Sequence, residues 1–134
     1  MSDWSTADLD RIGKAAELEI ATQRADGSLR PYVPVWVVRV NDELFARSWR
    51  GQAGAWYRHS RQRPEGRIRA GGAERDVTFE HPQTVPDDEI DQAYQAKYGR
   101  YGETYVGPMT GPDAKAATIR LMPAGPDTGR RTVR

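Results

Sequence analysis

The segment from Pro31 to Val40 restricts the fold of this chain more than any other feature. Its alternate positions carry bulky apolar side chains on both faces: Val33, Val35 and Val37 on one, and Tyr32, Trp36 and Val38 on the other. A strand that is bulky on both faces is typical of a central strand in a closed or curved sheet. Pro34 has no N–H to donate, so we expect it at a bulge or where no ladder partner is needed.

Five further segments are interpreted as strands, and tight turns connect several of them. The turns are supplied by Asp26-Gly27, Asn41-Asp42 and Gly71-Gly72. The strands are expected over 17–23, 43–49, 67–70, 73–80 and 116–122. Together with the first segment they give about six strands.

Three short helices are expected between these strands. The first begins after Ser5, which resembles a capping residue, and the second covers 53–63. The third runs from Pro86 to Tyr98, with acids in its first turn that suit the positive end of the helix dipole and Gly99 after its end. The segment 99–115 is rich in Gly, Pro and Tyr, so it is interpreted as a binding loop or lid. Its tyrosines, with Tyr98, could donate a proton to a substrate, although packing is the favoured role.

Helices this few and this short cannot cover both faces of a parallel sheet, so the order of elements favours an antiparallel barrel with appended helices. The expected class is α+β, with one domain over residues 1–122. Residues 123–134 are basic and are expected to form a disordered tail.

The composition excludes several kinds of site. The chain has no cysteine and two separated histidines, which leaves no thiol nucleophile and no metal cluster. It lacks both the roughly 20-residue apolar run of a membrane helix and the apolar core of a signal peptide. We therefore expect no membrane partner and a cytoplasmic location.

The stretch RSWRGQAGAWYRHS, residues 47–60, places two tryptophans and several arginines around a glycine-containing turn. Backbone N–H groups at a helix start form an anion site, and an arginine adds a bidentate fork for phosphate oxygens. Residues 47–75 carry eight arginines against two glutamates, so a nucleic-acid patch is an alternative. The overall net charge of +1 makes that alternative the weaker one. Part of the stretch is also expected in the core.

Several motifs resemble a known superfamily. Pro34-Val35-Trp36-Val37-Val38, Asn41-Asp42, Arg47-Ser48-Trp49, and Gly51 leading into Trp56-Tyr57-Arg58 are similar to the split β-barrel flavin- and deazaflavin-binding oxidoreductases, which are pyridoxamine-phosphate-oxidase-like. Within that superfamily, residues 71–80 and 90–99 resemble a small bacterial family of unknown function.

The resemblance implies a homodimer that binds FMN or the 8-hydroxy-5-deazaflavin coenzyme between its subunits and reduces or oxidises a small organic substrate. The phosphate would lie at Arg47, Ser48, Trp49, Arg50, Gly51 and Gln52, with Trp56, Tyr57 and Arg58 on the next turn and Pro34, Val35 and Trp36 beside the ring. No catalytic residue is assigned, because the cofactor carries hydride chemistry itself. A cofactor-free binding protein on the same barrel is the alternative.

Overall fold

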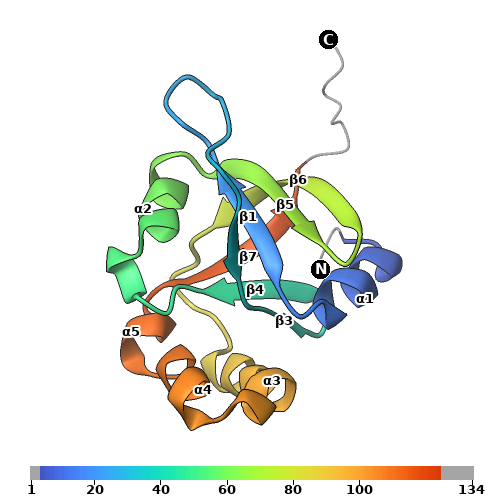
Figure 1. Ribbon diagram of the computed structural model, residues 1–134, viewed down its shortest axis with the longest axis vertical. Coiled ribbons are helices and arrows are strands. Elements are labelled where there is room, and N and C mark those ends of the chain that lie inside the picture. The colour runs from blue at the N-terminus through green and yellow to red at the C-terminus, as the bar shows by residue number, and fades with distance from the viewer. Residues whose placement is uncertain (1–3, 125–134) are drawn as a thin grey trace.

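Seven antiparallel strands form one sheet that curves into a nearly closed barrel in the computed structural model, which describes residues 4–124 (Figure 1). In chain order the strands are β1 Leu18–Thr22, β2 Val33–Val35, β3 Val37–Val40, β4 Glu43–Arg47, β5 Glu65–Ala70, β6 Ala73–Glu80 and β7 Thr118–Pro123. Their order in the sheet is β2-β1-β5-β6-β7-β4-β3. The α+β antiparallel barrel expected from the sequence is confirmed, with one strand more than the six expected.

The two edge strands of the sheet, β2 and β3, are consecutive in the chain, and this brings the edges of the barrel together. The segment 31–40 was expected to form one central strand, but it is divided at Trp36 and both halves are edge strands. Before Trp36 the chain pairs with β1, with Val35 opposite Leu18. After Trp36 it pairs with β4, with Val37 opposite Ala46. One bent segment therefore contributes both edges of the sheet. The gap between these edges, around Trp36, is called the split in the barrel wall. Pro34 is exposed on the edge strand β2, where the missing N–H costs no ladder bond on the outer side.

Five α-helices accompany the barrel in the described part of the chain, compared with the three expected. They are α1 Thr6–Lys14, α2 Ala55–Gln62, α3 Asp87–Tyr98, α4 Glu103–Met109 and α5 Pro112–Lys115. The additional helices come from the segment 99–115, which was interpreted as a loop or lid. In Figure 1, helices α3, α4 and α5 gather at one end of the barrel, while α2 and α1 lie on opposite sides of it.

The starts of α1 and α3 and the turn at Asn41 follow the local rules that the sequence indicated. The Ser5 side chain accepts a hydrogen bond from the Asp8 amide at 3.1 Å, which caps α1. Asn41 adopts a positive φ of 56° in the turn between β3 and β4, a conformation that asparagine tolerates. Acids fill the first turn of α3, as its dipole favours.

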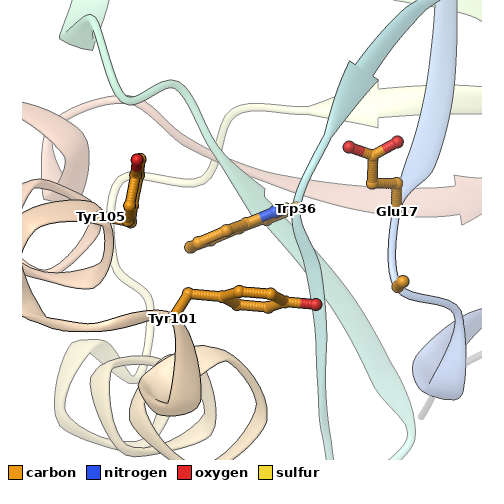
Figure 2. Close-up of a pocket in the computed structure, with 5 residues that line it drawn as sticks. Glu17, Trp36, Tyr101 and Tyr105 are labelled. Carbon is orange, nitrogen blue, oxygen red and sulfur yellow. The ribbon is translucent and has the colours of Figure 1, made fainter.

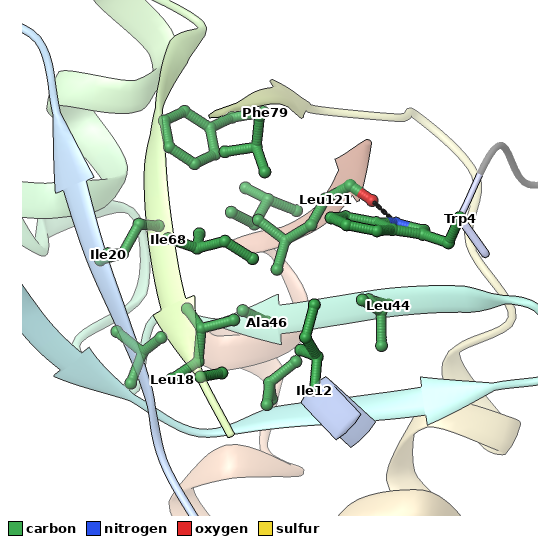
Figure 3. Packing of buried hydrophobic residues seen from close by; sticks show 14 of the residues in the cluster. Trp4, Ile12, Leu18, Ile20, Leu44, Ala46, Ile68, Phe79 and Leu121 are labelled. Carbon is green, nitrogen blue, oxygen red and sulfur yellow. Dashed lines mark hydrogen bonds between the residues drawn. The ribbon is translucent and has the colours of Figure 1, made fainter. Parts of the chain in front are cut away.

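Buried apolar side chains form two clusters. The larger one fills the barrel and extends under α1, and Figure 3 shows Ile12, Leu18, Ile20, Leu44, Ala46, Ile68, Phe79 and Leu121 converging there. Trp4 closes this cluster and donates its indole N–H to the Leu121 carbonyl at 2.8 Å. The smaller cluster lies outside the barrel, between β3, β4 and the helices α3 and α4.

The expected C-terminal tail falls almost wholly outside the described residues. Pro123 is the last residue of β7, and the amide of Ala124 donates to the Asp76 carbonyl at 2.9 Å. Within residues 4–124, every helix is too short or too polar to cross a membrane.

Candidate functional site

The turn that follows β4 has the sharp geometry expected of it. Ser48 is buried, its amide donates to Ala117, and its carbonyl accepts from Gly51. Gly51 has a φ of 69° and faces Asp113 of α5, so a side chain there would be both strained and crowded. A Cβ on Gly54 would overlap the Ser48 hydroxyl. The backbone of this turn is therefore held tightly between β4 and α5.

Helix α2 begins directly after this turn and lacks a capping side chain within residues 4–124. Gly54 occupies the N-cap position, so the first-turn amides of Ala55, Trp56 and Tyr57 have no intrahelical acceptor. Such amides, with the positive end of the helix dipole, favour an anion. The sequence-predicted anion site thus has free backbone donors.

Trp49 and Arg50, at the tip of the turn, are exposed. The Trp49 side chain is 66% accessible, the highest value among the large hydrophobic residues described. Gln52 is exposed and donates to the Ala116 carbonyl at 3.1 Å, and Arg58 is exposed and donates to the Ala53 carbonyl at 3.3 Å. Arg50 and Arg58 keep guanidinium N–H groups available to an outside ligand.

Trp56 and Tyr57 face inward. Trp56 is half-buried against the barrel core, and Tyr57 is buried at 3% accessibility. The two rings meet edge to face, and Tyr57 also meets His81 edge to face. Burial lowers the pKa of His81, with nearby Arg61 adding to the effect. Trp56 and Tyr57 therefore anchor α2 to the barrel core.

Arg47 lies inside the protein, with 1% of its surface accessible. Its guanidinium donates to Asp91 at 2.5 Å and to Asp87 at 3.0 Å, both on α3. It also donates to the Met109 carbonyl and the Thr118 hydroxyl at 3.0 Å each. Arg47 therefore joins β4 to the helices and to β7, and its donors point to the chain's own acceptors.

Trp36 is the sequence-predicted site residue that lines a cleft. Its indole stacks on Tyr98 at a centroid distance of 4.0 Å, with 2° between the planes, and on Tyr101 at 5.7 Å. The two phenol rings are only 6.2 Å apart, far short of the sum of their distances to Trp36 that rings on opposite faces of the indole would approach, so they do not sandwich it. The remaining indole face has no aromatic partner among residues 4–124.

The cleft beside Trp36 has a volume of about 440 Å³ and is lined by Ala16, Glu17, Trp36, Tyr101 and Tyr105. Figure 2 shows the indole projecting between Tyr105 on one side and Glu17 on the other, with Tyr101 beneath it. Tyr101 and Tyr105 are exposed, at 45% and 64%. The cleft is a largely aromatic site with one carboxylate, suited to a flat ligand.

Two tyrosines of α3 fill the split in the barrel. The Tyr94 hydroxyl accepts from the Arg47 amide at 3.0 Å and donates to the Trp36 carbonyl at 3.1 Å. The Tyr98 hydroxyl accepts from the Val37 amide at 3.2 Å and lies within hydrogen-bond distance of the Ala16 carbonyl. Burial raises the pKa of both tyrosines well above the usual value, so they remain protonated. These contacts satisfy the backbone where the strand bends.

The sequence did not assign Glu17, Tyr101 and Tyr105 to the cleft. The spacing of the tyrosines in 98–105 was the available signal, but their packing against Trp36 depends on a contact across more than 60 positions. Arg50 and Gly51 lie in the turn, and Arg58 reaches it through its bond to the Ala53 carbonyl, whereas Pro34, Val35 and Trp36 lie on the bent segment. The described residues contain no group of three His, Cys, Asp or Glu side chains that could hold a metal ion.

A family model matches residues 8–121, and its description is "uncharacterized protein conserved in bacteria" (DUF2255). No curated protein matches the chain. Three solved structures of similar fold are a F420-H2 dependent reductase (FDR-A), the heme storage protein HutZ from Vibrio cholerae, and a putative pyridoxamine 5'-phosphate oxidase from Listeria innocua.

The likeness to these three structures covers most of each chain. The reductase is 16% identical, with a TM-score of 0.58 over 80% of this chain and 93% of its own. HutZ is 16% identical, with a TM-score of 0.58 over 88% and 89%. The Listeria protein is 11% identical, with a TM-score of 0.58 over 89% and 92%. At these identities the likeness shows a shared split-barrel fold alone, and the family match shows that the chain belongs to the DUF2255 family of bacterial proteins.

Proposed function

We propose that this protein is an oxidoreductase that binds a flavin-type cofactor, FMN or the 8-hydroxy-5-deazaflavin coenzyme, as a homodimer. The observation that carries the proposal is the turn between β4 and α2, where an uncapped helix start lies beside the exposed Trp49 and Arg50. One structural neighbour is described as a F420-H2 dependent reductase, which favours the same class of ligand for the same barrel.

The donors at the turn suit a phosphate ester. The amides at the start of α2 offer N–H groups, and Arg50 and Arg58 can add charge-assisted bonds. Gly51 is buried against Asp113, where a side chain would be crowded, so it lets the turn pack closely on α5. Ser48, Gly51 and Gln52 hold the turn in shape through their bonds to Ala117, Ser48 and Ala116. Arg47 supports the site from inside by fixing the end of β4.

The aromatic residues suit the flat ring of such a cofactor or its substrate. Trp36 presents one indole face to the cleft, and Pro34 and Val35 precede it on the same bent segment. Trp49 is a large exposed apolar surface, as expected at a subunit interface. When bound, the cofactor would supply the hydride chemistry, while the protein orients the ring and excludes water.

Arginines elsewhere in 47–75 weaken the nucleic-acid alternative. Arg67 pairs with Asp76 at 2.6 Å, Arg69 with Glu19 at 3.1 Å, and Arg75 with Asp8 at 2.9 Å. With Arg47, half of the eight arginines in this stretch are already partnered by carboxylates. This reduces the free positive charge available to a nucleic-acid backbone.

Titration of the purified protein with FMN and with the deazaflavin coenzyme, followed by absorbance and by sedimentation, tests the proposal. We expect saturable binding of one cofactor by a dimer. Arg50→Ala should weaken that binding at least tenfold, because a charged hydrogen bond contributes about 1.5 kcal/mol or more. Arg61→Ala, an exposed arginine further along α2, is the matched control. Absence of binding by both cofactors would favour a cofactor-free barrel.

A further inference from the structure

A second cleft, of about 460 Å³, lies between the end of α1, strand β3 and one face of α3. Its apolar wall comes from Val38, Ala93, Ala96 and the ring of Tyr98. It shares none of the residues assigned to the cofactor turn, and it adjoins the Trp36 cleft at Ala16. Ala93, Ala96 and Lys97 recur at helical spacing, so α3 presents small side chains and one cation to the same groove.

Every charged residue that lines this cleft is a cation: Lys14, Arg39, Lys97 and Arg100. Arg39 is neutralised by Asp10 at 2.8 Å and by Asp42 at 3.7 Å. Lys14, Lys97 and Arg100 form no ion pair with any carboxylate of residues 4–124. Three positive charges therefore face one groove without a counter-ion from the described part of the chain.

Lys97 is the most strongly constrained of these cations. Its ammonium donates to the Val37 carbonyl at 2.7 Å and lies 5.0 Å from the centroid of the Tyr98 ring. Burial lowers its pKa to about 8, because these neutral partners do not replace the lost hydration. An ammonium has three donors, so two remain for a ligand. Arg100 lies over the Tyr101 ring and keeps most of its guanidinium donors free.

We propose that this cleft binds a small organic acid, with its carboxylate between Lys97 and Arg100 and its apolar body against Val38, Ala93 and Ala96. The carboxylate would supply the counter-ion that the cleft lacks, and Arg100 can hold it in a bidentate manner. The short alanine side chains leave room for the apolar body, whose burial adds hydrophobic stabilisation. This inference goes beyond the cofactor proposal, because it depends on different residues.

Binding should depend on pH through Lys97. The ammonium form binds the carboxylate, so affinity is greatest below pH 8 and falls as the pH rises through about 8. The other charged groups that face the cleft are Lys14, Arg100, and Arg39 with its partners Asp10 and Asp42; Glu17 lies nearby, beyond Tyr98. A bound carboxylate raises the pKa of Lys97, so binding near pH 8 takes up protons.

Titration calorimetry with hexanoate, hexan-1-ol and inorganic phosphate tests the proposal on the full chain. We expect saturable hexanoate binding at neutral pH, no binding of the alcohol and weaker binding of phosphate, which lacks the apolar body. Arg100→Gln is exposed and should not disturb folding, yet it should weaken hexanoate binding about tenfold. Lys97→Met should weaken it similarly and remove its dependence on pH near 8. Arg61→Gln on α2 should bind hexanoate unchanged.

Equal affinity for hexanoate and hexan-1-ol would overturn the proposal, because the cations would then contribute nothing. Lack of hexanoate binding by the folded wild-type protein, or unchanged binding by Arg100→Gln, would overturn it as well. The cofactor titrations do not involve these variants, so failure of one proposal is distinguishable from failure of the other.

Discussion

The inside of the barrel and the split in its wall are built by opposite means. Inside, apolar side chains from the strands and α1 fill the space, and Trp4 adds one indole hydrogen bond. At the split, around Trp36 and Arg47, hydrogen bonds and ion pairs from α3 hold the two sides together. The first region depends on non-directional burial, whereas the second depends on groups that must meet at fixed angles.

The comparison explains why the two proposed ligand sites border the split. The sheet cannot pair at the bend, so hydrogen bonds from Tyr94 and Tyr98 hold the backbone of the bent segment there. Trp36 then lies on one side of Tyr98, in the first cleft, and Lys97 on the other, in the second. In the barrel interior, buried apolar side chains fill the space instead. We expect changes at the split to differ from changes in the core in both size and pH dependence.

The largest effect is expected from Arg47→Met. It removes the buried partner of Asp87, Asp91 and the Met109 carbonyl. Asp91 keeps a second cation, Lys115, at 3.1 Å. Breaking such a buried network costs about 3 to 5 kcal/mol. Urea unfolding at equilibrium measures this loss. Arg69→Met, which breaks an exposed pair with Glu19, is the control and should cost less than about 1 kcal/mol. Similar losses for both variants would contradict the role given to Arg47.

Leu121→Ala tests the barrel interior. Leu121 is fully buried between Leu44 and Phe79, so its truncation removes apolar contacts and leaves a cavity that costs about 2 to 4 kcal/mol. Unlike Arg47→Met, it removes no charge and no hydrogen bond of the split. The same urea experiment at several pH values should give a constant loss, and a loss that changes with pH would argue against this view of the core.

Tyr98→Phe removes one hydroxyl from the split and keeps the ring. The Val37 amide loses its acceptor, and an unsatisfied buried N–H costs about 1 to 3 kcal/mol. The stack with Trp36 should persist, because it involves the ring faces. Unfolding by urea measures the loss, and hydrogen exchange at Val37 should accelerate. Normal exchange at Val37 would show that the hydroxyl does not hold the bend.

Lys97→Met should stabilise the protein at neutral pH, because methionine needs no hydration. The gain should be only about 1 kcal/mol, because water still reaches part of the lysine. From pH 8 to the usual lysine value of 10.5, the unfolded chain holds a proton on Lys97 that the native protein lacks. The stability of the wild type therefore rises with pH across this window, and the advantage of methionine shrinks. A variant that is less stable at neutral pH would show that the ammonium supports the fold.

Much of the fold could be predicted from local signals, and the candidate site only in part. Strand periods, the Asn41-Asp42 turn and the acids that open α3 gave the barrel and its class. The helices within 99–115 could not be found this way, because Gly and Pro in that segment favour a loop by local rules. Arg47 was expected beside a phosphate, and the structure pairs it instead with Asp87, whose presence the helix dipole already explained, and with Asp91.

By itself, the sequence determined the antiparallel barrel, the extended structure over Pro31 to Val40, and the glycine-containing turn before α2. These depend on the residue period and on turn chemistry, which act over a few positions. Only the tertiary structure decided that Arg47 is buried, that Trp36 stacks on Tyr98, and that Lys97 faces a groove without an acid. Each of these depends on contacts between residues 40 to 71 positions apart, for which no local pattern carries information.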